Sequence, residues 1–252
     1  MGFVLAFLFV VLFALIFSSS KRKGQKSYGA CSYDYARPRF FRKRYYDERL
    51  DEITSADRGT RSERDLISSL LDYGIPPRAI FHDLYVKNGK YGFAQIDIVV
   101  ATKVGLIVFE VKEYSGWIFG KGRQHQWTQV LNYGNEKNRF YNPVLQNESH
   151  IKVLQKQSKQ FENLPFYSVI VFDGKCELRD ISFIPDGTFV IKPHRLKDVL
   201  DIIFDSADAE YTDKHEVMRI LKAAVDNGAN EDMQTKHVKN IKDMLGKDRV
   251  LS

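Results

Sequence analysis

Two carboxylates and a lysine interrupt neighbouring apolar segments of this 252-residue chain. Asp97 lies within QIDIVV, and Glu110 and Lys112 lie within VFEVK. Buried ionisable groups are tolerated when they are paired or bind a metal ion. Two adjacent carboxylates repel each other unless a cation lies between them, and oxygen ligands with open water positions suit Mg²⁺ or Mn²⁺. A lysine beside such an ion can neutralise charge that develops on a phosphate, so the pattern indicates metal-dependent phosphoryl chemistry.

A simpler interpretation is a structural ion pair between Lys112 and either Asp97 or Glu110, with no metal ion. The acid-x-lysine pattern is short and common, and alone it would favour this ion pair. Here an acid in one apolar segment is followed by the acid-x-lysine pattern in the next. Three charged groups placed in buried strands favour the metal site.

Two predicted strands, 93–101 and 105–114, must position these residues. Side chains alternate along a strand, so Glu110 and Lys112 project to the same face. Only 102–104 separate the two strands, which predicts antiparallel pairing. That pairing brings Asp97 near Glu110.

The rest of the pattern predicts an α-β-β-β-α-β order, typical of an α/β fold with a mixed sheet flanked by helices. A helical apolar face spans 61–73 and ends at Gly74, and Pro143 begins a long helix that extends to about 164. Further strands are predicted at 79–86, 117–119, 126–131, 167–172 and 188–191, and further helices at 193–204, 212–226 and 230–245.

The N-terminus has the composition of a membrane anchor. Residues 1–17 contain no charged or polar side chain, and three serines extend the segment to residue 20. About 20 apolar residues span a bilayer as a helix, so a transmembrane helix is predicted over 1–20. The basic residues follow the apolar run, which places the C-terminal part in the cytoplasm as a single-pass protein of the inner (plasma) membrane. A cleaved signal peptide would carry its basic residues before the run; a buried core helix is the other alternative.

The basic charge of the chain is local. The net charge is +6, but residues 18–50 hold ten Lys/Arg against three acids, leaving 28 basic and 29 acidic residues elsewhere. We interpret 21–55 as a basic juxtamembrane linker on anionic lipid headgroups, or alternatively as an arm that stacks on nucleic acid. The whole protein is therefore not a basic nucleic-acid binder. Two cysteines form neither a disulfide framework nor a zinc pattern.

Several blocks in the middle of the chain occur together in a known order. They are Glu63, QID at 95–97, EVK at 110–112, Gly116 with Gly120, Trp127, and NPVLQNESHI at 142–151. In this order, residues from about 61 to 160 resemble the NERD, or nuclease-related, domain. That family is a branch of the PD-(D/E)xK nuclease superfamily. The resemblance implies a restriction-endonuclease-like core.

The resemblance also implies roles for individual residues. Asp97 and Glu110 would be metal ligands and Lys112 the catalytic lysine; Glu63 would be a further acid reaching the metal, and Gln146 a supporting catalytic residue from the later helix. Two positions depart from the family: Ile98 stands where histidine often follows the aspartate, and Ser62 where glycine often precedes the helix glutamate. Neither departure removes a presumed catalytic group.

The combined prediction has four segments: a transmembrane helix at 1–20, the linker at 21–55, a NERD-like nuclease core at 56–192 and C-terminal helices at 193–252. The predicted function is membrane-anchored, Mg²⁺- or Mn²⁺-dependent hydrolysis of DNA, as an endo- or exodeoxyribonuclease. A net charge of +5 over 112–159 would suit DNA phosphates. The alternative is a catalytically silent module that binds nucleic acid or protein at the membrane. None of the six histidines has metal-ligand spacing, so each is expected to be a surface or satisfied polar residue.

Overall fold

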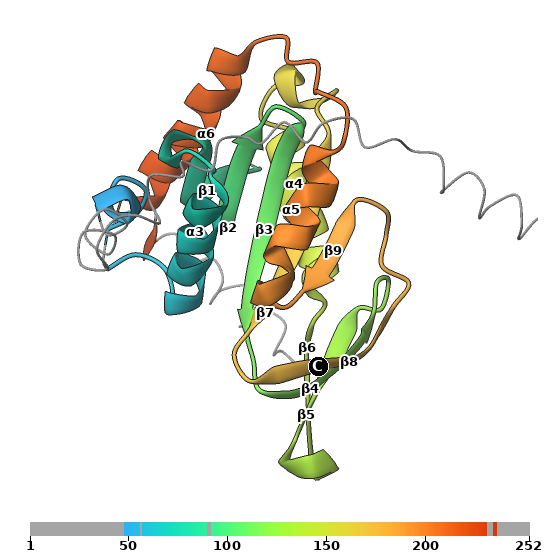
Figure 1. Cartoon of the computed structure of the whole chain (residues 1–252). Helices are drawn as coiled ribbons and strands as arrows, with labels where there is room; N and C mark the ends of the chain where they lie inside the picture. Colours follow the sequence, from blue (N-terminus) through green and yellow to red (C-terminus); the bar gives the residue numbers. More distant parts are fainter. Residues whose placement is uncertain (1–47, 56, 90–91, 231–233, 236–252) are drawn as a thin grey trace, which may run out of the picture. The chain divides into compact units, whose positions relative to one another are not determined.

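The computed structural model describes residues 48–55, 57–89, 92–230 and 234–235 (Figure 1). The predicted transmembrane helix, the linker as far as residue 47 and nearly all of the predicted helix at 230–245 lie outside these ranges. Within the described ranges, no helix has both the length and the apolar character needed to cross a bilayer.

A five-stranded mixed sheet carries the predicted strand pair in its interior. Its strands are β1 (Ile80–Asn88), β2 (Gly92–Thr102), β3 (Gly105–Glu113), β7 (Phe166–Asp173) and β9 (Thr188–Ile191), in the order β1-β2-β3-β7-β9. β1, β2 and β3 pair antiparallel, whereas β3, β7 and β9 pair parallel. The predicted antiparallel pairing of the second and third strands is therefore confirmed.

Helices cover both faces of this sheet. The helices are α3 (Arg61–Tyr73), α4 (Pro143–Gln155), α5 (Leu196–Phe204) and α6 (Lys214–Gly228). α3 and α5 share one hydrophobic cluster with Ile107 and Phe109 of β3, whereas α4 and α6 share another with Leu106 and Val108. The predicted mixed α/β fold with flanking helices is thus confirmed, and Glu110 continues the face of β3 that packs on α4.

A second sheet follows β3 and β7 along the chain. Its strands are β4 (Gly116–Lys121), β5 (Gln126–Leu131), β6 (Glu136–Tyr141) and β8 (Cys176–Ser182), in the order β6-β5-β4-β8 (Figure 1). Trp127, Ile118 and Phe172 form its buried core. The sequence did not predict β6 and β8. β6 is an edge strand with mostly exposed side chains and no apolar alternation, and in β8 the alternation of Cys176 and Leu178 is broken at Arg179, where the register to β4 shifts.

Helix α3 has the predicted bounds, whereas α4 is shorter than predicted. Thr60 caps α3 by accepting from the Glu63 N–H, and Gly74 ends the helix at φ +106°. α4 ends at Gln155 instead of near 164. Ser158, in an extended conformation, caps a separate 3-10 turn over Lys159–Phe161. A serine that bonds a nearby backbone N–H competes with continuation of the helix, which accounts for the early end.

Candidate active site

Asp97 lies where β2 and β3 separate. Their backbone pairing ends at Ile98 and Phe109. Beyond this point the Asp97 side chain, in place of a backbone carbonyl of β2, accepts a hydrogen bond from β3: its Oδ2 lies 2.8 Å from the Val111 N–H. The fold therefore fixes this carboxylate, and its Oδ1 has no hydrogen-bond partner in the described ranges.

Glu110 and Lys112 form a close ion pair on the α4 face of β3. The Glu110 side chain is 1% exposed, and its Oε1 lies 2.6 Å from the Lys112 Nζ. Burial opposes charge on the ammonium, but Glu110 and Asp97 together raise the pKa of Lys112 above its ordinary value. Lys112 therefore carries its positive charge at neutral pH. Glu110 and Lys112 project to the same face of β3, as the alternation of side chains along a strand predicted.

Helix α4 brings two polar side chains to Glu110 from the other side. Gln146 lines the same pocket, and His150 places its Nδ1 3.3 Å from the Glu110 Oε2. The His150 Nδ1 and the Glu110 Oε2 are both buried, and neither has a hydrogen-bond partner among the described residues, because their contact has poor hydrogen-bond geometry. Asn147, which lies between Gln146 and His150 in the sequence, is buried and donates to the Val108 carbonyl (2.8 Å) and the Ser168 hydroxyl (2.9 Å). These hydrogen bonds anchor α4 to the sheet.

Glu63 forms the opposite wall of the pocket. Its Oε2 lies 2.9 Å from the buried His82 Nε2, and its Oε1 accepts from the Thr60 hydroxyl at 3.0 Å. Burial raises the pKa of Glu63, but the hydrogen bonds from His82 and Thr60 outweigh it and lower the pKa overall. Glu63 therefore faces the site as predicted, but both its oxygens are already hydrogen-bonded.

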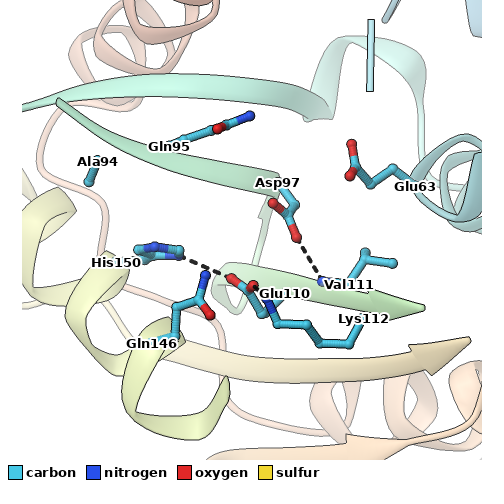
Figure 2. A pocket seen from close by; sticks show the side chains of 9 residues that line it. All are labelled: Glu63, Ala94, Gln95, Asp97, Glu110, Val111, Lys112, Gln146 and His150. Carbon is cyan, nitrogen blue, oxygen red and sulfur yellow. Dashed lines mark hydrogen bonds and ion pairs between the residues drawn. The ribbon is translucent and has the colours of Figure 1, made fainter. Parts of the chain in front are cut away.

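These side chains surround a pocket of about 440 Å³. We call it the catalytic pocket, after the role that the sequence predicts for its residues. It is lined by Glu63, Ala94, Gln95, Asp97, Glu110, Val111, Lys112, Gln146 and His150. Figure 2 shows Glu110 between His150 and Lys112, with Glu63 on the far side of Asp97. All five sequence-predicted site residues therefore line one pocket.

Sequence reasoning missed two polar residues of the pocket. His150 lies four residues after Gln146, so both occupy one face of α4, and this spacing is the signal that could have identified it. Gln95 donates to Asp83 at 2.8 Å, and Asp83 in turn is bound by Arg58 at 2.8 Å. No local sequence pattern predicts these contacts, because they connect Arg58 of a loop with Asp83 of β1 and Gln95 of β2.

The two carboxylates disfavour each other's charge. Desolvation is the largest cause that raises the pKa of Asp97 well above its ordinary range, followed by the neighbouring Glu110. The Val111 N–H opposes this rise, as does the Lys112 ammonium more weakly. One cation, Lys112, thus serves two buried acids, and an additional cation at the pocket would favour the ionised form of Asp97.

The donor set fits a hydrated divalent ion better than a fully protein-ligated one. No group of three or more His, Cys, Asp or Glu side chains in the described part of the chain has a metal-binding arrangement. Mg²⁺ commonly keeps several waters and uses one or two carboxylates together with substrate phosphate oxygens. Asp97 Oδ1 and the unpartnered Glu110 Oε2 match this need. These two residues could hold such an ion without a third protein ligand.

Comparisons with known proteins agree with this geometry. Residues 58–173 match the nuclease-related domain, abbreviated NERD, and this range contains every residue of the catalytic pocket. An uncharacterized protein of Bacillus anthracis is 29% identical over 168 residues, which cover 67% of this chain and 76% of that protein. No solved structure matches the chain significantly. The ordered sequence blocks, the pocket to which several of them contribute and the family match lead to one conclusion: residues 58–173 form a nuclease-related (NERD) domain.

Proposed function

We propose that this protein is a membrane-anchored nuclease that hydrolyses DNA phosphodiester bonds with Mg²⁺ or Mn²⁺. The observation that carries the proposal is the convergence of Asp97, Glu110 and Lys112 in one pocket, with a Glu110 oxygen that is buried and has no hydrogen-bond partner among the described residues. A buried carboxylate oxygen without a hydrogen bond is costly, and its contact with the His150 Nδ1 at 3.3 Å neutralises it only when that imidazole is protonated. A cation is the ligand that its charge favours.

The chain's own residues have separable roles in this proposal. Asp97 and Glu110 would hold the ion, which when bound would lower the pKa of a water molecule and neutralise phosphate charge. Glu110 holds the Lys112 ammonium within 2.6 Å, where it can stabilise the negative charge that develops on phosphorus oxygens. Gln146 and His150 line the pocket from α4 and offer polar groups to water or phosphate. Glu63 contributes negative charge from its helix start.

The apolar segment at 1–20 and the basic linker that follows support the anchoring part of the proposal. Anchoring of this kind would place the nuclease domain at the cytoplasmic side of the inner membrane. Its DNA would then be encountered close to the lipid surface.

A second candidate is a nucleic-acid or protein-binding module without hydrolysis. The observation that favours it is the absence of a three-ligand metal group from the described ranges, together with an ion pair that already neutralises Glu110. A binding module, however, does not require the costly burial of two acids and a lysine. The two candidates differ in one measurable property, which is cleavage.

The test is cleavage by the full-length chain. The protein is incubated with plasmid DNA, single-stranded DNA or RNA, in Mg²⁺, Mn²⁺ or EDTA. We expect metal-dependent cleavage that is lost in Asp97→Asn and Glu110→Gln and retained in Glu148→Gln. Glu148 is a matched control, because it is an exposed acid on α4 whose partner is Lys152. Cleavage in EDTA, or equal activity in Glu110→Gln, would refute the proposed mechanism; no cleavage with any metal would leave the binding module.

A further inference from the structure

Phe183, between β8 and β9, has two unfavourable features. Its side chain is 76% exposed, although most large apolar side chains of the domain are buried. Its backbone adopts φ +55°, a conformation that residues other than glycine rarely adopt. Strained backbone conformations cluster at functional sites. Tyr133 shares both features, so the surroundings of the Phe183 ring must decide whether it belongs to a binding site.

A basic turn lies beside this ring. Lys121 Nζ is 5.7 Å from the centre of the Phe183 ring, and Arg123 lines the same hollow of about 900 Å³. Gly122 fixes the two segments together: its N–H donates to the Ser182 carbonyl at 2.9 Å, and a Cβ there would lie 2.1 Å from the Phe183 carbonyl oxygen. Asp186 is the acid of the lining, so the hollow carries two positive charges and one negative charge.

The basic turn is also tied to the helix that lines the catalytic pocket. The fully buried Asn142 side chain donates to the carbonyls of Lys121 (3.3 Å), Gly122 (2.9 Å) and Gln124 (2.7 Å). Its Oδ1 accepts from the Val144 N–H and so caps α4. Gln146 of the catalytic pocket follows four residues later, about 6 Å along the helix axis. The basic turn and the catalytic pocket are therefore connected through the N-terminal end of α4.

We propose that the hollow at Phe183 binds an unpaired nucleotide of a single-stranded nucleic acid whose backbone continues to the catalytic pocket. An exposed aromatic ring stacks on an unpaired base but cannot reach a base within a duplex, and cations beside the ring bind the adjacent phosphates. Phe183 is the stacking platform, and Lys121 and Arg123 are the phosphate contacts. This inference rests on the proposed function, and it extends that function by naming single strands as the preferred substrate class.

The test is binding of the full-length chain to fluorescein-labelled oligothymidylate, to oligouridylate and to a DNA duplex, measured by anisotropy in EDTA. Phe183→Asn removes the ring and keeps a residue that tolerates positive φ. Tyr133→Asn is the matched control, since Tyr133 is 94% exposed with φ +54° but does not line the hollow. Base stacking predicts roughly 5- to 150-fold weaker single-strand binding for Phe183→Asn, and near wild-type binding for Tyr133→Asn and for Phe183→Tyr.

The salt dependence tests the two cations separately. Lys121→Gln and Arg123→Gln should each reduce the slope of log affinity against log salt by about 0.7 for a single strand. Equal affinity of wild type and Phe183→Asn for single strands, or stronger binding of the duplex by wild type, would overturn the inference while leaving metal-dependent cleavage intact. Single-strand binding that depends on Phe183 in a protein that never cleaves would support this inference and refute the nuclease. Absence of any binding by wild type would overturn this inference, whereas the cleavage assay with Mg²⁺ or Mn²⁺ decides the nuclease proposal.

Discussion

Replacing Lys112 with methionine tests how the catalytic pocket is held together. The substitution keeps an unbranched side chain of similar length but removes the cation that lies 2.6 Å from Glu110. Because Glu110 is 1% exposed, its charge would remain buried, and its remaining contact would be the His150 Nδ1 at 3.3 Å, which neutralises it only when that imidazole is protonated. Breaking a buried pair in this way costs about 3–5 kcal/mol, a large part of the roughly 5–15 kcal/mol that stabilises a typical domain.

The assay is urea unfolding of the full-length chain at pH 7 in EDTA, followed by tryptophan fluorescence, because the buried Trp127 reports on the domain. Lys112 is charged at this pH, because its pKa is raised in the folded protein. Its contribution to the free energy of unfolding should be fully present below about pH 10.4, the ordinary pKa of lysine, and should be lost as pH rises through the higher pKa of the folded state. Lys197→Met is the control. Its partner Asp201 is exposed, so the cost should not exceed about 1 kcal/mol.

A double variant separates the ion pair from the shape of the site. Glu110→Gln with Lys112→Met removes both charges, and we expect it to recover most of the stability lost in Lys112→Met alone. If Lys112→Met loses less than about 1 kcal/mol, or if the double variant is as unstable as the single one, the argument that Glu110 depends on this cation is wrong.

Four further results are expected. Lys112→Arg keeps a cation for Glu110 and should retain most of the stability, but it should lose cleavage because the guanidinium has a different shape. Asp97→Asn should raise the melting temperature in EDTA at neutral pH. The pKa of Asp97 is raised in the folded protein, so ionisation of this carboxyl lowers the free energy of unfolding of wild type as pH rises above about 4. The difference in melting temperature between variant and wild type should therefore vanish near about pH 4. Mn²⁺ or Mg²⁺ should raise the melting temperature of wild type but not of an Asp97→Ala, Glu110→Ala variant. Asn142→Ala should cost about 3 kcal/mol in urea unfolding, since it uncaps α4 and leaves buried carbonyls unpaired, whereas the exposed Asn138→Ala should cost little.

The predicted anchor is open to a direct measurement. The full-length chain should fractionate with membranes and resist extraction by salt, because the apolar segment 1–20 is long enough to span a bilayer. A tag placed after Ser252 should be protected from external protease in intact cells. Cleavage of that tag from outside would contradict the predicted orientation.

The sequence predicted the sheet and the acid-acid-lysine set because both depend on local rules. Alternation along β3 places Glu110 and Lys112 on one face, and the short connection forces β2 to return beside it. His150 escaped prediction for the opposite reason. Helical periodicity shows that His150 and Gln146 share one face of α4. Long-range contacts such as those of Asn147 decide which strand this face covers, and no local pattern predicts them.

The same distinction explains the second sheet. β6 has one partly buried side chain, Phe140, and its pairing to β5 is set by a turn and not by an apolar pattern. The Phe183 conformation likewise depends on Gly122, 61 positions earlier in the chain, which no local signal connects to it. The pairing of β6 and the conformation of Phe183 each depend on contacts between separate segments, so the sequence alone could not predict them.

The hydrogen bond between the Val111 N–H and the Asp97 carboxylate has a spectroscopic consequence. An amide proton bonded to a carboxylate resonates at a frequency that depends on the charge of that carboxylate. The backbone amide signal of Val111 in a nitrogen–proton correlation spectrum should therefore follow protonation of Asp97, and should follow cation binding at the same oxygen pair. A single resonance from β3 of the nitrogen-15-enriched protein would thus record the state of the pocket without a substrate or any substitution.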